Sequence, residues 1–93
     1  MRILGYIDHA VYKITVFKMD TRLSIKFENG AQEQTFKFRS SPAINSLVEV
    51  RKLVDRTFLE LVDKRFQEMA QALQASMQRN FPPPEEDEFD VII

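Results

Sequence analysis

Residues 23–38 of the chain, LSIKFENGAQEQTFKF, alternate apolar and polar side chains on either side of an Asn-Gly pair. The apolar positions are Leu23, Ile25, Phe27, Phe36 and Phe38. A period of two is typical of antiparallel strands that bury one face. Asn29-Gly30 favours a tight turn, because both residue types tolerate positive φ. The stretch therefore predicts a β-hairpin.

The length of the turn sets the pairing of the two strands. A two-residue loop would place Leu23 opposite Phe36. A loop of four residues, ending at Gln32, would place Ile25 opposite Phe36 and would also pair Leu23 with Phe38. The longer loop pairs apolar residues better, and both registers turn the same side chains towards the core.

The same alternation appears upstream, in Tyr12, Ile14 and Val16. Asp20-Thr21 is the expected turn after this strand. Ile3 to Ile7 predicts a further strand, which a turn at Asp8-His9-Ala10 follows. We expect a three- to four-stranded antiparallel sheet over about residues 2–39.

One long helix is expected after the sheet. Pro42 suits a first helical position, and Ser46-Leu47-Val48-Glu49 reads as a capping box, so the helix begins between 42 and 47. No Gly or Pro occurs from Ala43 to Asn80. The chain therefore predicts an α+β domain over 1–80, with a helix over about 43–79 and a Pro-rich, acidic tail over 81–93.

This helix is too long for its sheet. A strand of seven residues spans roughly 23 Å, whereas a helix over 47–79 spans roughly 50 Å. The apolar stripe nevertheless continues beyond the sheet, in Val62, Phe66, Met69, Leu73 and Met77. Either the chain reverses near Lys64-Arg65 into a helical hairpin, or the stripe packs on a second copy. No turn residue occurs there, so we expect a homodimer of undetermined orientation.

Composition excludes several classes of protein. Ninety-three residues form one small domain, for which oligomerisation is a common means of stabilisation. The chain has no Cys, and no stretch approaches the ~20 apolar residues of a membrane span. We expect a cytoplasmic protein that does not contact membranes.

The usual signatures of catalysis are missing. His9 is the single histidine, and two glycines do not make a phosphate-binding loop. The Ser residues cluster where the helix begins, where capping explains them. We therefore expect no enzyme activity, no metal site and no cofactor.

The sheet face opposite the helix is rich in basic residues. Alternation places these candidate nucleic-acid-binding residues on it: Lys13, Phe17, Arg22, Lys26, Lys37 and Arg39. Cations that follow phosphates, with an aromatic ring that stacks on a base, are typical of surfaces for single-stranded nucleic acid. The alternative is an ordinary solvated face, on which Lys26 pairs with Glu33 and Phe17 lies in a dimer interface.

The order of elements resembles that of PUR-type proteins and of the related Whirly and coactivator folds. The resemblance covers residues 2–75 as topology, and GAQEQTFKFRSSPAINSLVEVRKLV, residues 30–54, carries its strand-to-helix transition. It implies pairing of the units and binding of single strands on the sheet. It includes no diagnostic motif, so it transfers no functional residue.

The tail, FPPPEEDEFDVII over 81–93, concentrates negative charge. Residues 85–90 hold five acids, and the nine other acids against thirteen Lys and Arg leave the rest of the chain at +4. Such a run is expected to be disordered. Its apolar end predicts a short partner-binding ligand, formed by Phe89, Val91, Ile92 and Ile93.

The tail is similar to the acidic, apolar-tipped tails of bacterial single-stranded-DNA-binding proteins. The sequence therefore favours a dimeric protein that binds single-stranded nucleic acid on its sheet and whose tail modulates that binding or recruits partners. The alternative is a protein–protein adaptor that acts through the tail and the helix, with no role in nucleic-acid binding.

Overall fold

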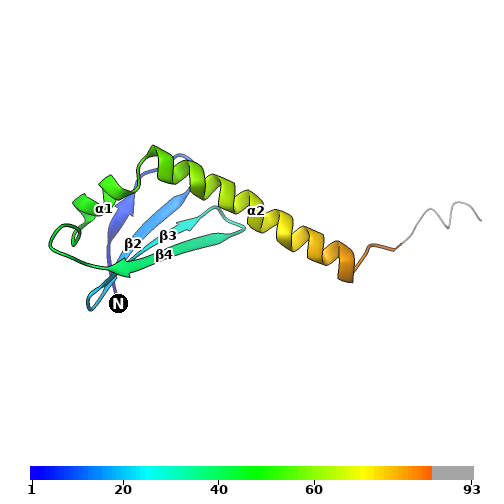
Figure 1. The fold of residues 1–93 in the computed structure, drawn as a ribbon, viewed down its shortest axis with the longest axis horizontal. Helices are drawn as coiled ribbons and strands as arrows, with labels where there is room; N and C mark the ends of the chain where they lie inside the picture. Colours follow the sequence, from blue (N-terminus) through cyan, green and yellow to red (C-terminus); the bar gives the residue numbers. More distant parts are fainter. Residues whose placement is uncertain (85–93) are drawn as a thin grey trace, which may run out of the picture.

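A computed structural model describes residues 1–84 of the chain. Its elements are β1 (Arg2–Ile7), β2 (Lys13–Met19), β3 (Arg22–Glu28), β4 (Glu33–Arg39), α1 (Leu47–Leu53) and α2 (Arg56–Asn80). The strands form one antiparallel sheet in the order β1-β2-β3-β4, and both helices lie on the same face of it (Figure 1). The predicted α+β architecture, a sheet followed by a long C-terminal helix, is confirmed.

The β3–β4 hairpin has the longer of the two predicted loops. Glu28 pairs with Glu33, and Ile25 therefore lies opposite Phe36. The loop over 29–32 is held by the Asn29 side chain, whose Oδ1 accepts hydrogen bonds from the backbone N–H groups of Ala31 (3.0 Å) and Gln32 (2.8 Å). The asparagine thus acts through its side chain, as in other Asx turns.

The other two hairpins also use local chemistry. Asp20, in the two-residue loop between β2 and β3, has a φ of 55°, which Asp tolerates better than most residues. In the β1–β2 loop, the Nδ1 atom of His9 accepts hydrogen bonds from the N–H groups of Val11 and Tyr12, both at 3.1 Å. The single histidine therefore has a structural role in closing this loop.

The core lies between the sheet and the helices. Its buried residues are Ile14, Val16, Leu23, Ile25, Phe27, Val50, Val54, Val62 and Phe66. Phe27 is the centre of an aromatic cluster, with ring centroids 5.8 Å from those of Phe36 and Phe58. The positions that face the core are odd-numbered in β3 and even-numbered in β2 and β4, as antiparallel pairing requires. They meet the inner sides of both helices in one layer.

The helical region is divided, contrary to the prediction of one helix over about 43–79. The predicted capping box opens α1, where the Glu49 carboxylate accepts hydrogen bonds from the Ser46 N–H (3.0 Å) and hydroxyl (2.6 Å). The chain then leaves helical geometry at Val54, and Asp55 caps α2 by accepting from the Phe58 N–H at 2.9 Å. An aspartate cap, without Gly or Pro, is sufficient to restart the helix.

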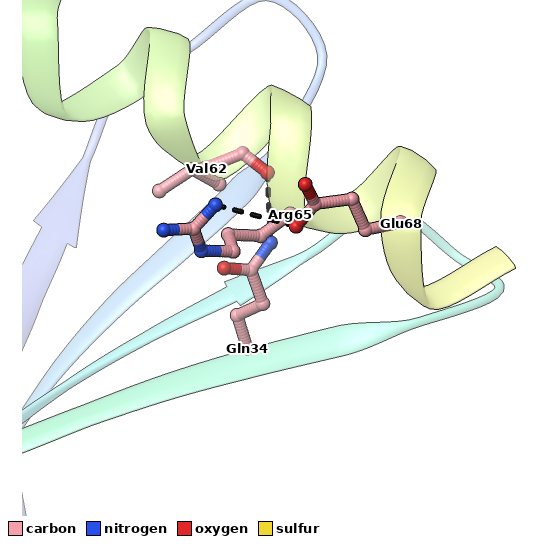
Figure 2. A network of polar contacts seen from close by, with 4 residues as sticks. All are labelled: Gln34, Val62, Arg65 and Glu68. Carbon is pink, nitrogen blue, oxygen red and sulfur yellow. Dashed lines mark hydrogen bonds and ion pairs between the residues drawn. The ribbon is translucent and has the colours of Figure 1, made fainter. Parts of the chain in front are cut away.

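Glutamines of the β3–β4 hairpin attach α2 to the sheet. The Nε2 of Gln34 donates to the carbonyl oxygen of Val62 at 2.8 Å (Figure 2). The Nε2 of Gln32 donates to the carbonyl oxygen of Phe66 at 3.3 Å. Tyr12 donates its hydroxyl to Asp63 from the other side. α2 is continuous through Lys64-Arg65, so the helical hairpin considered from sequence does not form.

The predicted dimer stripe is shorter than expected, because its first two residues pack against the sheet of their own chain. Val62 and Phe66 are 1% and 4% exposed within the chain itself, because the sheet reaches further along α2 than the length comparison suggested. They belong to the core of the protomer. Met69, Leu73 and Met77 lie beyond the sheet and remain exposed.

Candidate functional site

The sheet face opposite the helices, here called the open face, carries all six predicted nucleic-acid-binding residues. Cross-strand pairing arranges them in rows, in which Phe17 lies opposite Ser24 and Ser24 opposite Lys37. In the row towards the β3–β4 turn, Lys26 lies opposite Thr35, and at the other end Arg22 lies opposite Arg39. No described element covers this face (Figure 1).

A shallow hollow of about 340 Å³ lies in the middle of the open face. Its lining contains four of the predicted residues, Phe17, Arg22, Lys26 and Lys37. The lining also includes the apolar side chains of Met1 and Met19. A ligand with both a ring and a charged group would therefore meet apolar surface and cations in the same hollow. Lys13 and Arg39 lie outside this hollow.

The structure adds one aromatic residue that the sequence analysis missed. Tyr6 lies opposite Thr15, and therefore on the same face as Phe17. The Nζ atom of Lys13 lies 5.9 Å from the centroid of the Tyr6 ring. Simple alternation from Ile3 does not place Tyr6 there, because a bulge between Ile3 and Gly5 shifts the register of β1.

A glycine lies at the bulge. A Cβ atom built at Gly5 would lie 2.6 Å from Cδ2 of Leu47, at the start of α1, so a larger residue would require the Leu47 side chain to move. The bulge turns Tyr6 to the open face. The Gly at this position of a strand was the signal that points to a bulge.

One end of the open face is electrostatically balanced. Glu28 lies directly opposite Glu33, a pairing of like charges. The Nζ atom of Lys26 lies 3.9 Å from a carboxylate oxygen of each of them. Lys26 therefore compensates the acidic pair, and within residues 1–84 it is the one predicted basic residue that forms an ion pair with a carboxylate.

The other end of the open face is not balanced. Arg22 lies directly opposite Arg39, and like charges in this position are destabilising. Within residues 1–84, no carboxylate lies within 4.0 Å of the charged nitrogens of Arg22, Lys37 or Arg39. A second hollow, lined by Arg22, Lys37, Phe38 and Arg39, lies at this end. An anion placed there would remove the repulsion.

The remaining predicted sites have different outcomes. Met69, Leu73 and Met77 form an exposed apolar stripe with exposed fractions of 38%, 60% and 54%. The predicted partner-binding residues Phe89, Val91, Ile92 and Ile93 lie outside the described residues.

Neither a metal site nor a membrane span is found in the described part of the chain. In residues 1–84, no three His, Asp or Glu side chains are grouped closely enough to hold a metal ion. Neither described helix is long and apolar enough to span a membrane.

Two groups near the helices have shifted pKa values. Burial, together with the hydrogen bond to Asp63, raises the pKa of Tyr12 to about 12. The hydrogen bond from the Ser46 hydroxyl, followed by that from the Asn45 N–H, lowers the pKa of Glu49. Both groups stabilise contacts of the fold, and neither lies on the open face.

Comparisons with protein-family models, with curated proteins and with solved structures found no significant match to this chain. The functional argument therefore depends on the geometry and charge of the open face.

Proposed function

We propose that the protein is a non-enzymatic, homodimeric binding protein that holds single-stranded nucleic acid on the open face of its sheet, in the cytoplasm. The observation that carries the proposal is the pairing of Arg22 with Arg39, without a described carboxylate, at the edge of a hollow that contains Phe17. The resemblance to single-strand-binding folds agrees with it in topology.

The arrangement suits a phosphate backbone with exposed bases. A guanidinium group binds phosphate through two parallel hydrogen bonds, so one phosphate between Arg22 and Arg39 replaces repulsion by attraction. A base that enters the hollow meets Phe17, and a neighbouring base has Tyr6 within the same face. Stacking of this kind is tolerant of sequence.

The acidic segment, residues 85–90, competes with an anionic ligand for the same cations. α2 runs about 21 Å from Phe66, beside the β3–β4 turn, to Asn80, and points away from the sheet (Figure 1). The arginines lie a further ~20 Å away, at the opposite end of β3.

The ten residues from Phe81 to Asp90 span at most roughly 33–36 Å when fully extended, which is comparable with the greatest separation of about 40 Å. Chain length therefore allows the proposed competition within one chain and between two copies.

Fluorescence anisotropy of labelled single-stranded DNA and RNA, at two salt concentrations, tests the proposal. The full chain is compared with a full-length variant in which the five acids of 85–90 are replaced by their amides. We expect salt-sensitive binding that strengthens in the amide variant. Absence of binding by both proteins at low salt would refute the proposal and leave the adaptor function, through the tail, as the alternative.

A further inference from the structure

The second half of α2 lacks any packing partner in the described structure. Every residue from Gln67 to Asn80, here called the overhang, is exposed except the partly buried Ser76. An isolated helix of about 14 residues is marginally stable in water. The overhang is nevertheless a regular continuation of α2 (Figure 1), so a partner that packs on it would stabilise it.

The apolar side of the overhang faces in a defined direction. At about 100° per residue, Met69, Leu73 and Met77 lie within roughly 60° of Val62 around the helix axis. Val62 faces the sheet of its own chain. The exposed stripe is therefore a direct extension of the face that packs on the sheet.

This direction determines how two copies can pair. In a parallel pair, both sheets would lie in the space between the two helices. Packed helices are only 8–10 Å apart, and a single sheet layer already occupies about 10 Å. In an antiparallel pair, the two sheets lie at opposite ends, and the overhangs meet without obstruction.

We propose that two copies form an antiparallel, two-fold symmetric dimer through the overhangs, centred on Leu73. This inference rests on the homodimer of the proposed function and specifies its geometry. Leu73 then faces the partner's Leu73, and Met69 faces the partner's Met77, because the stripe is spaced evenly on both sides of Leu73. Ala70 and Ala72 flank the stripe, and their small side chains permit close approach of the helices.

The charged residues of the overhang lie away from its apolar stripe. Glu68 and Arg79 are the only charged residues of the overhang. At about 100° per residue, both lie more than about 100° around the helix axis from Leu73, and Glu68 is paired with Arg65 of its own chain at 3.2 Å. The stripe therefore offers an uncharged surface to a second copy.

A hollow at the end of the sheet completes the interface. It has a volume of about 370 Å³, and its lining includes Val11, Tyr12, Asn29, Gln32, Phe66 and Ala70. It lies where α2 leaves the sheet, between the β1–β2 and β3–β4 loops. The same register brings the partner's Phe81 level with Arg65, next to this hollow.

Phe81 is 82% exposed in its own chain, and its N–H is bonded to the Met77 carbonyl at 2.7 Å, which holds it at the end of α2. We therefore assign the partner's Phe81 to the hollow.

Introduced cysteines test the orientation, because the natural chain has none. Met69→Cys and Met77→Cys variants of the full chain are oxidised separately and as a mixture, and disulfide-linked dimers are measured on non-reducing gels. We expect dimers to form mainly in the mixture. Disulfides that form in each variant alone, and no better in the mixture, would indicate a parallel pair and overturn the proposal.

Sedimentation equilibrium tests the interface itself. Leu73→Glu is compared with Leu61→Glu, the same change at another exposed position of α2 (46% exposed) that lies on a different side of the helix. Leu73→Glu places two carboxylates at the two-fold axis, and should weaken dimerisation by at least about 100-fold. Leu61→Glu should leave it unchanged.

Phe81→Ala tests the hollow, and should weaken dimerisation by about 10-fold or more while the helical circular-dichroism signal persists. A monomeric natural protein, or dimers unaffected by Leu73→Glu, would refute the inference. A dimer linked in another way would overturn this geometry and leave single-strand binding intact, so the two proposals fail separately.

Discussion

The arginine pair on the open face predicts that one double substitution will stabilise the fold and weaken binding. Replacement of Arg22 and Arg39 by glutamine removes two like charges that face each other across β3 and β4. The glutamines keep most of the side-chain length and the capacity to donate hydrogen bonds. The change therefore tests charge with little effect on packing, since both positions are exposed.

The magnitudes follow from the geometry. Relief of a directly opposed pair of like charges contributes about 0.2–1 kcal/mol to the free energy of unfolding. Loss of the one phosphate held between the two arginines lowers the slope of log affinity against log salt by about 0.7 for a single strand. If each lost charge-assisted hydrogen bond contributes about 1.5 kcal/mol or more, affinity at low salt falls on the order of 100-fold.

Urea denaturation measures the first effect, and anisotropy of labelled single strands at several salt concentrations measures the second. Lys26→Gln is the matched control, because it also removes one positive charge from the open face. Lys26, however, lies 3.9 Å from both Glu28 and Glu33, so its replacement leaves an uncompensated acidic pair. The control should destabilise the fold by a similar ~0.2–1 kcal/mol.

The reasoning is refuted if the double substitution lowers stability, or if binding and its salt dependence do not change. Either result would mean that Arg22 and Arg39 are already compensated or that the ligand binds elsewhere. Equal effects of Lys26→Gln and of the arginine substitutions on stability would also contradict the argument.

Four further predictions concern other parts of the chain. Because the pKa of Tyr12 is raised from 10.0 to about 12, its contribution to stability is complete below pH 10 and is lost as the pH rises towards 12. The free energy of unfolding of Tyr12→Phe, measured by urea denaturation, should therefore change less with pH in this window than that of the natural chain. The lowered pKa of Glu49 gives the opposite dependence, and the stability difference between the natural chain and Glu49→Gln should shrink as the pH falls below 4.5. Gly5→Ala should destabilise the fold by about 1–3 kcal/mol, because the new Cβ lies 2.6 Å from Leu47, and less in a chain that also carries Leu47→Ala. Finally, replacement of the acids in 85–90 by amides should strengthen single-strand binding measured by anisotropy; the same strengthening in a Leu73→Glu background would indicate that the segment acts within one chain, and its loss there would indicate action between two copies.

Local rules determined much of the fold. Alternation in the first forty residues predicted the sheet, and apolar pairing selected the four-residue loop before β4. The capping box at Ser46 and Glu49 located the start of α1, and the absence of Gly and Pro predicted a long helix. These features depend on neighbours within a few residues of one another, so the order of side chains along the chain is sufficient to specify them.

Other features depend on contacts between distant parts of the chain, and the tertiary structure alone established them. The sheet extends far enough along α2 to bury Val62 and Phe66, which a comparison of lengths did not anticipate. Gly5, packed against Leu47 of α1, lies at the bulge that brings Tyr6 to the open face. A one-residue shift in register reverses which face a side chain occupies, so periodicity within a single strand does not determine these positions.

The candidate site shows the same division. The sequence by itself determined which residues of β2, β3 and β4 share the open face, because side chains alternate along these three strands. Only the paired strands showed that Lys26 compensates two glutamates while Arg22 and Arg39 oppose each other without a described carboxylate. Charge balance depends on which residues lie opposite each other, and that is set by the register of the sheet as a whole.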